Sequence, residues 1–135
     1  MLDTAMARPG GVDGLEFRDE VRSAVERYHD ALNQHDIDAA VAAFTDDGLI
    51  DCTPPPDGER YEGAIGIRAL FRQLFDSESK RTFDIEEVFI AGDRAVVRWR
   101  HHWVEASGRR GHVRGVDILR VRDGKIAEKL AYVKG

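Results

Sequence analysis

Cysteine is nearly absent from this sequence of 135 residues, in which Cys52 stands alone. A single cysteine excludes an internal disulfide, and a chain without disulfides favours a reducing compartment. The sequence also lacks an apolar run of transmembrane length, and its first residues, MLDTAMARPGGVDG, lack the charged-then-apolar order of a signal peptide. We therefore expect a cytoplasmic protein that has no membrane partner.

The sequence also has fewer positively than negatively charged residues. The chain carries 20 lysine and arginine residues against 25 aspartate and glutamate residues, for a formal net charge of −5. Because non-specific binding to nucleic acid needs a surplus of cations, we expect no nucleic-acid partner. Hydrophobic residues make up 42% of the chain and charged residues 33%, which is ordinary for a globular protein of one domain.

The chain divides into a short arm and one domain. Residues 1–14 hold three glycines and a proline in no periodic pattern, so we expect an arm outside the core and a domain over residues 15–135. Apolar residues then recur at helical spacing in three stretches, which predicts three helices. The stripes are Phe17, Val21, Ala24, Val25, Tyr28, Ala31 and Leu32; then Ile37, Ala40, Val41 and Phe44, with Asp36 as N-cap; then Ile67, Leu70, Phe71, Leu74 and Phe75. Between the last two, Leu49–Cys52 is predicted as a short strand that prolines 54–56 end.

After Ser79 the period of the apolar residues changes from 3.6 to 2, which predicts strands. The apolar parity switches between Ile85 and Val88, as is typical of a β-bulge, and bulges bend sheets. A tight turn at Gly92-Asp93 leads into a strand over about 94–105, which residues 106–109 join to a strand over about 110–122. Asp123-Gly124, a strong hairpin signal, separates that strand from the last one, over 126–133. Helices followed by an antiparallel meander predict an α+β fold: three N-terminal helices packed on a strongly curved antiparallel sheet of four to five strands, which encloses an apolar pocket.

Alternation along the strands separates an apolar face from a charged one. The apolar face carries Ala95, Val97, Trp99, His101 and Trp103 on one strand, and Val113, Gly115, Asp117, Leu119 and Val121 on the next. We place this face against the helices. On the last strand, the parity of Lys129 lets it look toward Asp117, and such a pair would hold Asp117 ionised and favour base chemistry. Alternatively, Lys129 lies at the pocket mouth with its stem buried.

Several short motifs, in order along residues 17–134, resemble the nuclear transport factor two-like superfamily. They are Arg27-Tyr28, Ala31-Leu32-Asn33, Asp36-Ile37-Asp38, Phe44, Asp46-Asp47, the helix through Gly63 and Ile67, Gly115-Val116-Asp117-Ile118, Arg120-Val121 and Asp123-Gly124-Lys125-Ile126. Within this superfamily the chain is most similar to the SnoaL-like cyclases and the ketosteroid isomerases. The resemblance implies a cone-shaped fold, a deep pocket between helices and sheet, and a homodimer packed through the outer face of the sheet.

The resemblance also implies roles for individual residues. Tyr28 matches the tyrosine with which ketosteroid isomerases hydrogen-bond the substrate carbonyl, and Asp117 matches their protonated aspartic acid with the same task. SnoaL-like cyclases carry an acid/base aspartate on the strand of Asp117. Cys52 stands where the isomerases have their general base, and the neighbouring Asp51 points to the opposite face of the strand. This departure argues against a steroid isomerase.

His101, between Trp99 and Trp103, is the third catalytic candidate, because a histidine needs little pKa adjustment to work near neutral pH. All three candidates have a structural alternative: Tyr28 and Asp117 as buried hydrogen-bonding partners, and His101 as part of the pocket wall. The other expected pocket residues are Cys52, Phe44, Leu70, Trp99, Trp103, Val113, Leu119 and Lys129. We expect Cys52 to be a small apolar lining residue and not a nucleophile. No metal site or cofactor is predicted, since His101 and His102 project to opposite faces and no other ligand cluster is evident.

These residues together predict a cofactor-independent enzyme that acts on a hydrophobic, carbonyl-bearing small molecule. The reaction would be proton abstraction next to the carbonyl, leading to isomerisation, cyclisation or dehydration. Tyr28 would polarise the carbonyl, while Asp117 and His101 would divide the acid and base roles. Two alternatives stay open: a non-catalytic ligand-binding or dimerisation module, favoured by Cys52 at the base position, and an epoxide hydrolase in which Asp117 with Lys129 or His101 activates water.

Overall fold

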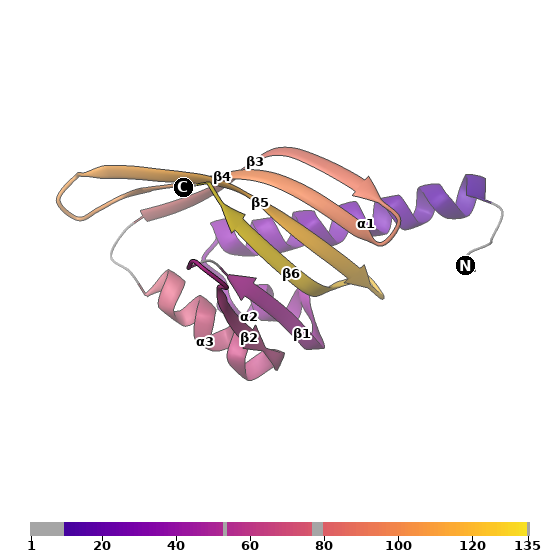
Figure 1. The fold of residues 1–135 in the computed structure, drawn as a ribbon, viewed down its shortest axis with the longest axis horizontal. Helices are drawn as coiled ribbons and strands as arrows, with labels where there is room; N and C mark the ends of the chain where they lie inside the picture. The colour runs from indigo at the N-terminus through magenta and orange to yellow at the C-terminus, as the bar shows by residue number, and fades with distance from the viewer. Residues whose placement is uncertain (1–9, 53, 77–79, 135) are drawn as a thin grey trace.

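The computed structural model describes residues 10–52, 54–76 and 80–134, which form three helices and one six-stranded sheet. The helices are α1 (Gly10–Asn33), α2 (Ile37–Ala42) and α3 (Gly63–Phe75); the strands are β1 (Phe44–Cys52), β2 (Glu59–Glu62), β3 (Lys80–Ala91), β4 (Arg94–Val104), β5 (Arg110–Arg122) and β6 (Lys125–Val133). The strands lie in the order β2-β1-β6-β5-β4-β3, and the helices pack on the sheet (Figure 1), which confirms the predicted α+β class. None of the described helices is both long and apolar enough to cross a membrane.

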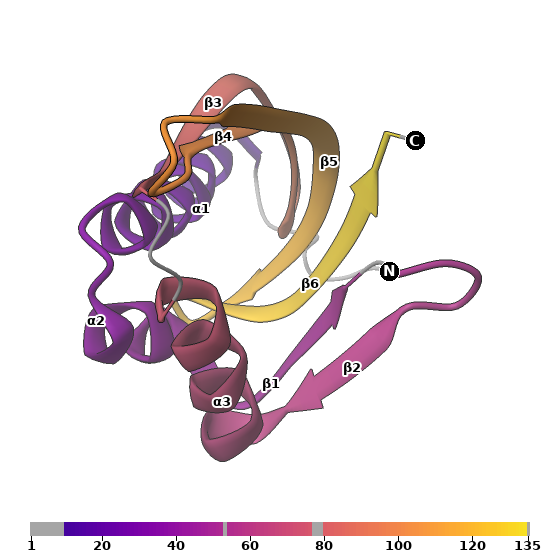
Figure 2. The same cartoon turned by 90° about the vertical axis from the view of Figure 1, so that its left-hand side faces the viewer.

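The finer architecture differs from the prediction in three respects. First, β1 and β2 separate α3 from the other two helices, so the helices are not all N-terminal. Second, the sheet has six strands and is mixed, because β1 runs parallel to β6 with Ile50 opposite Lys129. Third, the sheet bends over the helices (Figure 2) but is not the strongly curved cone that was expected. The unpredicted strand, β2, offers Tyr61 as its one apolar residue, so no alternation marks it.

Helix α1 buries the predicted apolar stripe against the sheet. Its buried residues include Val21, Ala24, Val25, Tyr28, Ala31 and Leu32. Asn33, at the end of the helix, fixes α1 to β3, because its side chain donates to the Phe83 carbonyl at 2.9 Å and accepts from the Phe83 amide at 2.8 Å. The helix begins at Gly10, so residues 10–14 of the predicted arm are helical, and residues 1–9 lie outside the described residues.

Helix α2 is shorter than its apolar pattern predicts. Asp36 is the N-cap, as expected, and its carboxylate accepts from the amide of Ala39 at 3.0 Å. The helix ends at Ala42, and Phe44 begins β1 opposite Ile126 of β6. Pairing with a distant strand thus overrides the local helical preference of this segment. The spacing of apolar residues within the segment cannot predict such a pairing. Phe44 is nevertheless buried, as the stripe implies.

Strands β3 to β6 form the predicted antiparallel meander. The register shifts between Ile85 and Glu87 where β3 pairs with β4, which confirms the predicted bulge. Asp123 and Gly124 adopt φ values of 54° and 75°, as a two-residue hairpin turn between β5 and β6 requires. The hairpin pattern therefore placed the last two strands correctly.

Two tryptophans of β4 lie over two glycines of β5. Trp99 is directly opposite Gly115, and Trp103 is directly opposite Gly111. A Cβ atom added to Gly115 would lie 2.4 Å from the Trp99 ring, and one added to Gly111 would lie 2.5 Å from the Trp103 ring. The glycines leave room for the indoles. The pair of Trp99 and Gly115 fixes the inner surface of the sheet at the strand position next to Val97 and Asp117.

Candidate functional site

Three polar side chains from distant parts of the chain meet in the interior. Tyr28 comes from α1, Asp117 from β5 and Lys129 from β6. Lys129 Nζ donates a hydrogen bond to the Tyr28 hydroxyl oxygen at 2.8 Å and lies 3.8 Å from Asp117 Oδ2. All three residues are buried: Tyr28 is 0% exposed, Asp117 2% and Lys129 9%. We refer to Tyr28, Asp117 and Lys129 as the buried triad.

The register of the last two strands explains how the triad is built. Leu119 is opposite Lys129 and Asp117 is opposite Ala131, so Asp117 and Lys129 are diagonal neighbours on the same face. The position of Lys129 on this inward face agrees with its predicted parity. Tyr28 approaches from the helix layer, where the Phe44 ring packs edge-on against it at 5.3 Å. The apolar packing keeps the triad out of water.

Burial and mutual attraction set the charge of the triad. Burial alone would lower the pKa of Lys129, but the nearby Asp117 carboxylate and the Tyr28 hydroxyl outweigh it and raise the pKa. Burial raises the pKa of Tyr28, although Lys129 opposes that shift. Lys129 is therefore an ammonium ion and Tyr28 a neutral phenol near neutral pH. Since the phenol oxygen already accepts from Lys129, the phenol proton can be donated elsewhere.

Three buried polar atoms in this region lack a hydrogen-bond partner among the described residues. They are Asp117 Oδ1, His29 Nε2 and Trp99 Nε1. Leaving such an atom unpaired costs about 1–3 kcal/mol, so each one calls for an explanation. Asp117 Oδ1 is an acceptor, His29 Nε2 is an acceptor when the other ring nitrogen holds the proton, and Trp99 Nε1 is a donor. A bound molecule that carries both donors and an acceptor could satisfy all three.

His29 is the residue of this region that the sequence did not single out. It is 4% exposed, and its Nδ1 lies 3.1 Å from the carbonyl oxygen of Val25 on the preceding turn. Burial lowers the pKa of His29, so the imidazole is neutral. The available signal was its spacing of four from Val25 and three from Leu32, which places it at the edge of the buried stripe.

His101 is held in an aromatic stack beside the triad. Its ring lies 4.0 Å from the Trp99 ring, nearly parallel, and 4.4 Å from the Phe83 ring, edge-on. Burial, followed by repulsion from Lys129, lowers the pKa of His101 to about 3. A neutral imidazole of this kind can accept a hydrogen bond, but it holds no imidazolium proton to give near neutral pH. These features favour the pocket-wall alternative.

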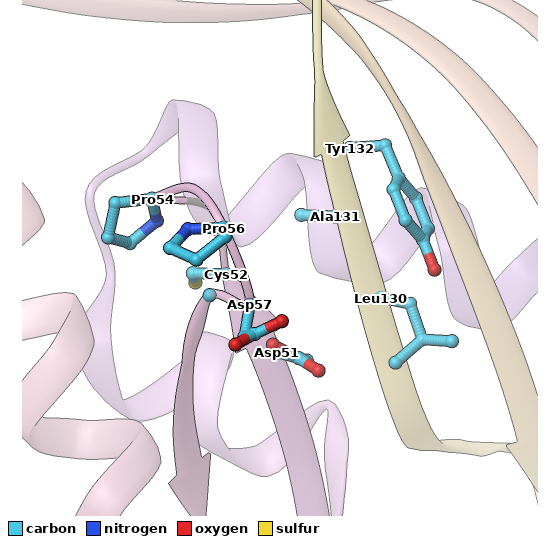
Figure 3. A pocket seen from close by; sticks show the side chains of 9 residues that line it. Asp51, Cys52, Pro54, Pro56, Asp57, Leu130, Ala131 and Tyr132 are labelled. Carbon is cyan, nitrogen blue, oxygen red and sulfur yellow. The ribbon is translucent and has the colours of Figure 1, made fainter.

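One cavity opens where β1 and β6 diverge, and its volume is about 160 Å³. It is lined by Asp51, Cys52, Pro54, Pro56, Asp57, Gly58, Leu130, Ala131 and Tyr132. Figure 3 shows Ala131 on the side of β6 that faces Cys52 and Pro56, with Leu130 and Tyr132 on the other side of the strand. Because Ala131 is opposite Asp117 in the β5–β6 pair, this cavity approaches the triad from the β1 side.

A second, more open groove lies between α1 and β3 and has a volume of about 400 Å³. Its lining residues are Glu26, His29, Asp30, Asn33, Phe83, Asp84 and Ile85. His29 lines this groove and its ring lies 5.4 Å from the Tyr28 ring, so the groove borders the buried region on the α1 side. The enclosed apolar pocket that the sequence predicts stays a prediction.

The other predicted pocket residues divide into two groups. Phe44 and Leu119 are buried in the core, Leu70 and Val113 are packed against it, and Cys52 is a half-buried free thiol whose pKa burial raises. Trp103 lies apart: four residues from Trp99 along β4, it is about 13 Å away. The Arg81 guanidinium covers its ring at 5.4 Å. Among the described residues, no group of three or more histidine, cysteine, aspartate or glutamate side chains is placed to hold a metal ion.

Comparison with known proteins agrees with this architecture. Residues 25–129 match the family model of the SnoaL-like domain. The chain is similar to the crystal structure of a nuclear transport factor two-like protein of unknown function from Mesorhizobium loti, with 35% identity, a TM-score of 0.74, and coverage of 87% of this chain and 93% of that one. No curated protein matches the chain.

Two further solved structures are similar. One is a putative polyketide cyclase from Xanthomonas campestris pv. campestris, with 25% identity, a TM-score of 0.75, and coverage of 87% of this chain and 92% of that one. The other is an epoxide hydrolase of M. tuberculosis described as LEH-like, with 20% identity, a TM-score of 0.74, and coverage of 87% and 84%; its likeness shows the fold alone. Because the family model spans most of the sequence and the fold agrees, the chain belongs to the SnoaL-like domain family.

Proposed function

We propose that this protein is a cofactor-independent enzyme that moves a proton at the carbon next to a carbonyl group in a hydrophobic small molecule. Isomerisation, cyclisation and dehydration all begin with this step. The observation that supports the proposal best is the geometry of the buried triad, in which Lys129 Nζ donates to the Tyr28 hydroxyl at 2.8 Å and lies 3.8 Å from Asp117.

Tyr28 and Lys129 would act on the carbonyl oxygen. The Tyr28 hydroxyl donates to that oxygen, and the Lys129 ammonium group behind it makes the phenol a stronger donor. As the neighbouring C–H bond breaks, its electron pair forms a carbon–carbon double bond and negative charge collects on the oxygen. A preorganised donor in a site away from water stabilises that charge, typically by several kcal/mol.

Asp117 would be the base. Its Oδ2 faces Lys129, and its Oδ1 is buried without a partner among the described residues. The Oδ1 atom takes the proton from carbon, and the resulting carboxylic acid returns it to another atom of the substrate, which closes an isomerisation. In a dehydration, the same proton would leave with the departing hydroxyl group as water. His101 and Cys52 would line the site, since the pKa values of both favour their neutral forms.

The proposal is tested by hydrogen exchange into 1-tetralone, a bicyclic ketone, in D₂O, followed by proton NMR. We expect the wild-type protein to accelerate deuterium uptake at the carbon next to the carbonyl. We expect Tyr28→Phe and Asp117→Asn to lower that rate roughly 10²-fold or more, as loss of an acid–base group or an oxyanion donor does. The exposed His112→Asn is the matched control. Equal rates in wild type and both triad variants, with ligand binding intact, would favour a non-catalytic binding module.

Epoxide opening is a second candidate that the same triad favours. Asp117 Oδ1, which has no partner within the described part of the chain, would take a proton from water, while Tyr28, supported by Lys129, donates to the epoxide oxygen. The balance is simple: water adds across one C–O bond and a diol forms. Incubation with styrene oxide and detection of the diol separates this activity from proton exchange.

We also propose that two copies pair through the outer face of the sheet. A continuous apolar row crosses four strands there, from Phe89 of β3 through Val96 and Ile118 to Leu130 of β6. Phe89 is 57% exposed. Arg98 forms ion pairs with Glu86 and Glu87 beside the row, so the face carries both signs of charge. An apolar row with charges of both signs beside it suits a second copy of the same surface.

A further inference from the structure

His29 presents a buried lone pair that no described residue satisfies. The residue is 4% exposed, and its Nε2 atom is buried without a hydrogen-bond partner in the described part of the chain. The oxygen of the adjacent Tyr28, by contrast, accepts a hydrogen bond from Lys129, and its own proton stays available. Burying an unpaired ring nitrogen is unfavourable, so packing alone does not account for a histidine here.

The hydrogen bond on the other ring nitrogen determines what Nε2 can do. Nδ1 lies 3.1 Å from the Val25 carbonyl oxygen, and a carbonyl oxygen can only accept, so Nδ1 holds the proton. Because the ring is neutral, Nε2 is left as a pure acceptor. It can therefore bind a hydroxyl or another donor, but it cannot itself donate to a carbonyl.

The surroundings of His29 place this acceptor beside the proposed site. The His29 and Tyr28 rings are 5.4 Å apart in an edge-to-face arrangement. His29 also lines the groove between α1 and β3, whose walls carry the carboxylates of Glu26, Asp30 and Asp84. The side chain of Asn33, in the same wall, is already hydrogen-bonded to the backbone of Phe83. The Asp84 carboxylate is already paired with His102 and Arg100. The carboxylates of Glu26 and Asp30 still give the groove acceptors and negative charge, which suits a neutral ligand with hydrogen-bond donors and disfavours an anion.

We propose that His29 Nε2 accepts a hydrogen bond from a hydroxyl group of the substrate, so that the site prefers hydroxylated ketones over the same ketones without the hydroxyl. The inference rests on the proposed function, because it assumes that Tyr28 holds the carbonyl oxygen. Tyr28 then hydrogen-bonds the carbonyl oxygen and His29 the hydroxyl group of the same molecule. Specificity of this kind is strong, because a ligand that lacks the hydroxyl leaves a buried acceptor unpaired.

The test compares the dissociation constants of 1-tetralone and its 5-, 6- and 7-hydroxy derivatives, measured by tryptophan quenching or calorimetry. His29→Asn is the informative variant, because its amide nitrogen can still donate to the Val25 carbonyl while the Nε2 acceptor is lost. His112→Asn, on the exposed part of β5, is the matched control. We expect at least one hydroxylated derivative to bind wild type and the control roughly tenfold more tightly than 1-tetralone, and His29→Asn to lose that preference.

A preference that persists in His29→Asn, or the absence of any preference in wild type, overturns the inference. A second readout needs no ligand: long-range proton–nitrogen NMR spectra of the wild-type protein report which nitrogen of His29 holds the proton. A proton on Nε2 would also overturn it. These failures differ from failure of the proposed function, which would show as deuterium uptake by 1-tetralone that is insensitive to Tyr28→Phe and Asp117→Asn.

Discussion

Lys129 Nζ donates a hydrogen bond to the Tyr28 hydroxyl oxygen at 2.8 Å, although 101 residues separate the two in sequence. The contact joins the first helix to the last strand and places a buried cation beside Asp117. A buried cation is tolerated only where its charge is balanced and its protons find acceptors. Both the stability of the domain and the chemistry proposed for it therefore depend on Lys129.

Lys129→Met is expected to destabilise the domain by about 3–5 kcal/mol, because it leaves the Asp117 carboxylate buried without its counter-ion. Urea unfolding followed by tryptophan fluorescence measures this free energy. The double variant Lys129→Met with Asp117→Leu should recover much of the loss, since an apolar pair of similar volume needs no compensation. A double variant that is less stable than Lys129→Met would contradict this account of the ion pair.

The stability of the domain is expected to fall as the pH falls below about 6.5. Unfolded His101 takes up a proton near that pH, whereas folded His101, with a pKa of about 3, does not. The folded state is therefore favoured above pH 6.5, and the advantage is lost as the pH falls toward 3. One proton corresponds to a slope of about 1.4 kcal/mol per pH unit.

Urea unfolding of wild type and His101→Gln at pH 7, 6 and 5 measures that slope. Between pH 6 and 5, His101→Gln should reduce the slope by up to the value for one proton, about 1.4 kcal/mol per pH unit. His112→Gln, an exposed control, should leave the slope unchanged. The pKa of His29 is also lowered by burial, so part of the wild-type slope is expected to survive in His101→Gln. Identical slopes in all three proteins would mean that His101 is not shielded from protonation in the fold.

Gly115→Ala is expected to cost about 1–3 kcal/mol, because the new methyl group would overlap both the buried Trp99 ring and the backbone carbonyl oxygen of Tyr132. Gly111→Ala is the matched control: its methyl group meets Trp103, which is half-buried and has room to move. We expect Gly111→Ala to cost less than Gly115→Ala in thermal unfolding, and Gly115→Ala alone to shift the emission of Trp99. Equal costs for the two substitutions would argue against the close contact at Gly115.

Phe89→Asp is expected to convert the proposed dimer into a monomer. The carboxylate would be buried against the apolar row of the second copy, which costs several kcal/mol. Light scattering after size-exclusion chromatography measures the mass. The control is Ile65→Asp, since Ile65 is 89% exposed and lies on α3, away from the outer sheet face. A wild-type protein that is monomeric at the highest soluble concentration would disprove the dimer.

Local patterns in the sequence were sufficient for most of the elements. The stripe from Val21 to Leu32 is buried on α1, and the parity switch after Ile85 is a bulge. The turn at Asp123-Gly124 has the expected backbone angles. These features depend on neighbours within a few residues, so periodicity and turn chemistry predict them. Phe44 was misassigned because it pairs with Ile126 of the distant β6, and β2 was missed because Tyr61 is its one apolar residue, so no alternation marks it.

The site shows the same division. That Lys129 shares a face with Asp117 followed from parity and a single hairpin register, and the structure confirms it. That Lys129 donates to Tyr28 required the docking of α1 onto the sheet, which no local pattern encodes.

Short-range periodicity was thus enough to predict the fold class, the meander and the inward face of its strands. The packing of helices and strands established that β1 lies parallel to β6, that Lys129 donates to Tyr28, and that the lone pair of His29 is buried without a partner among the described residues. Each of these depends on how layers pack, because desolvation and long-range register are properties of the assembled molecule and not of neighbouring residues.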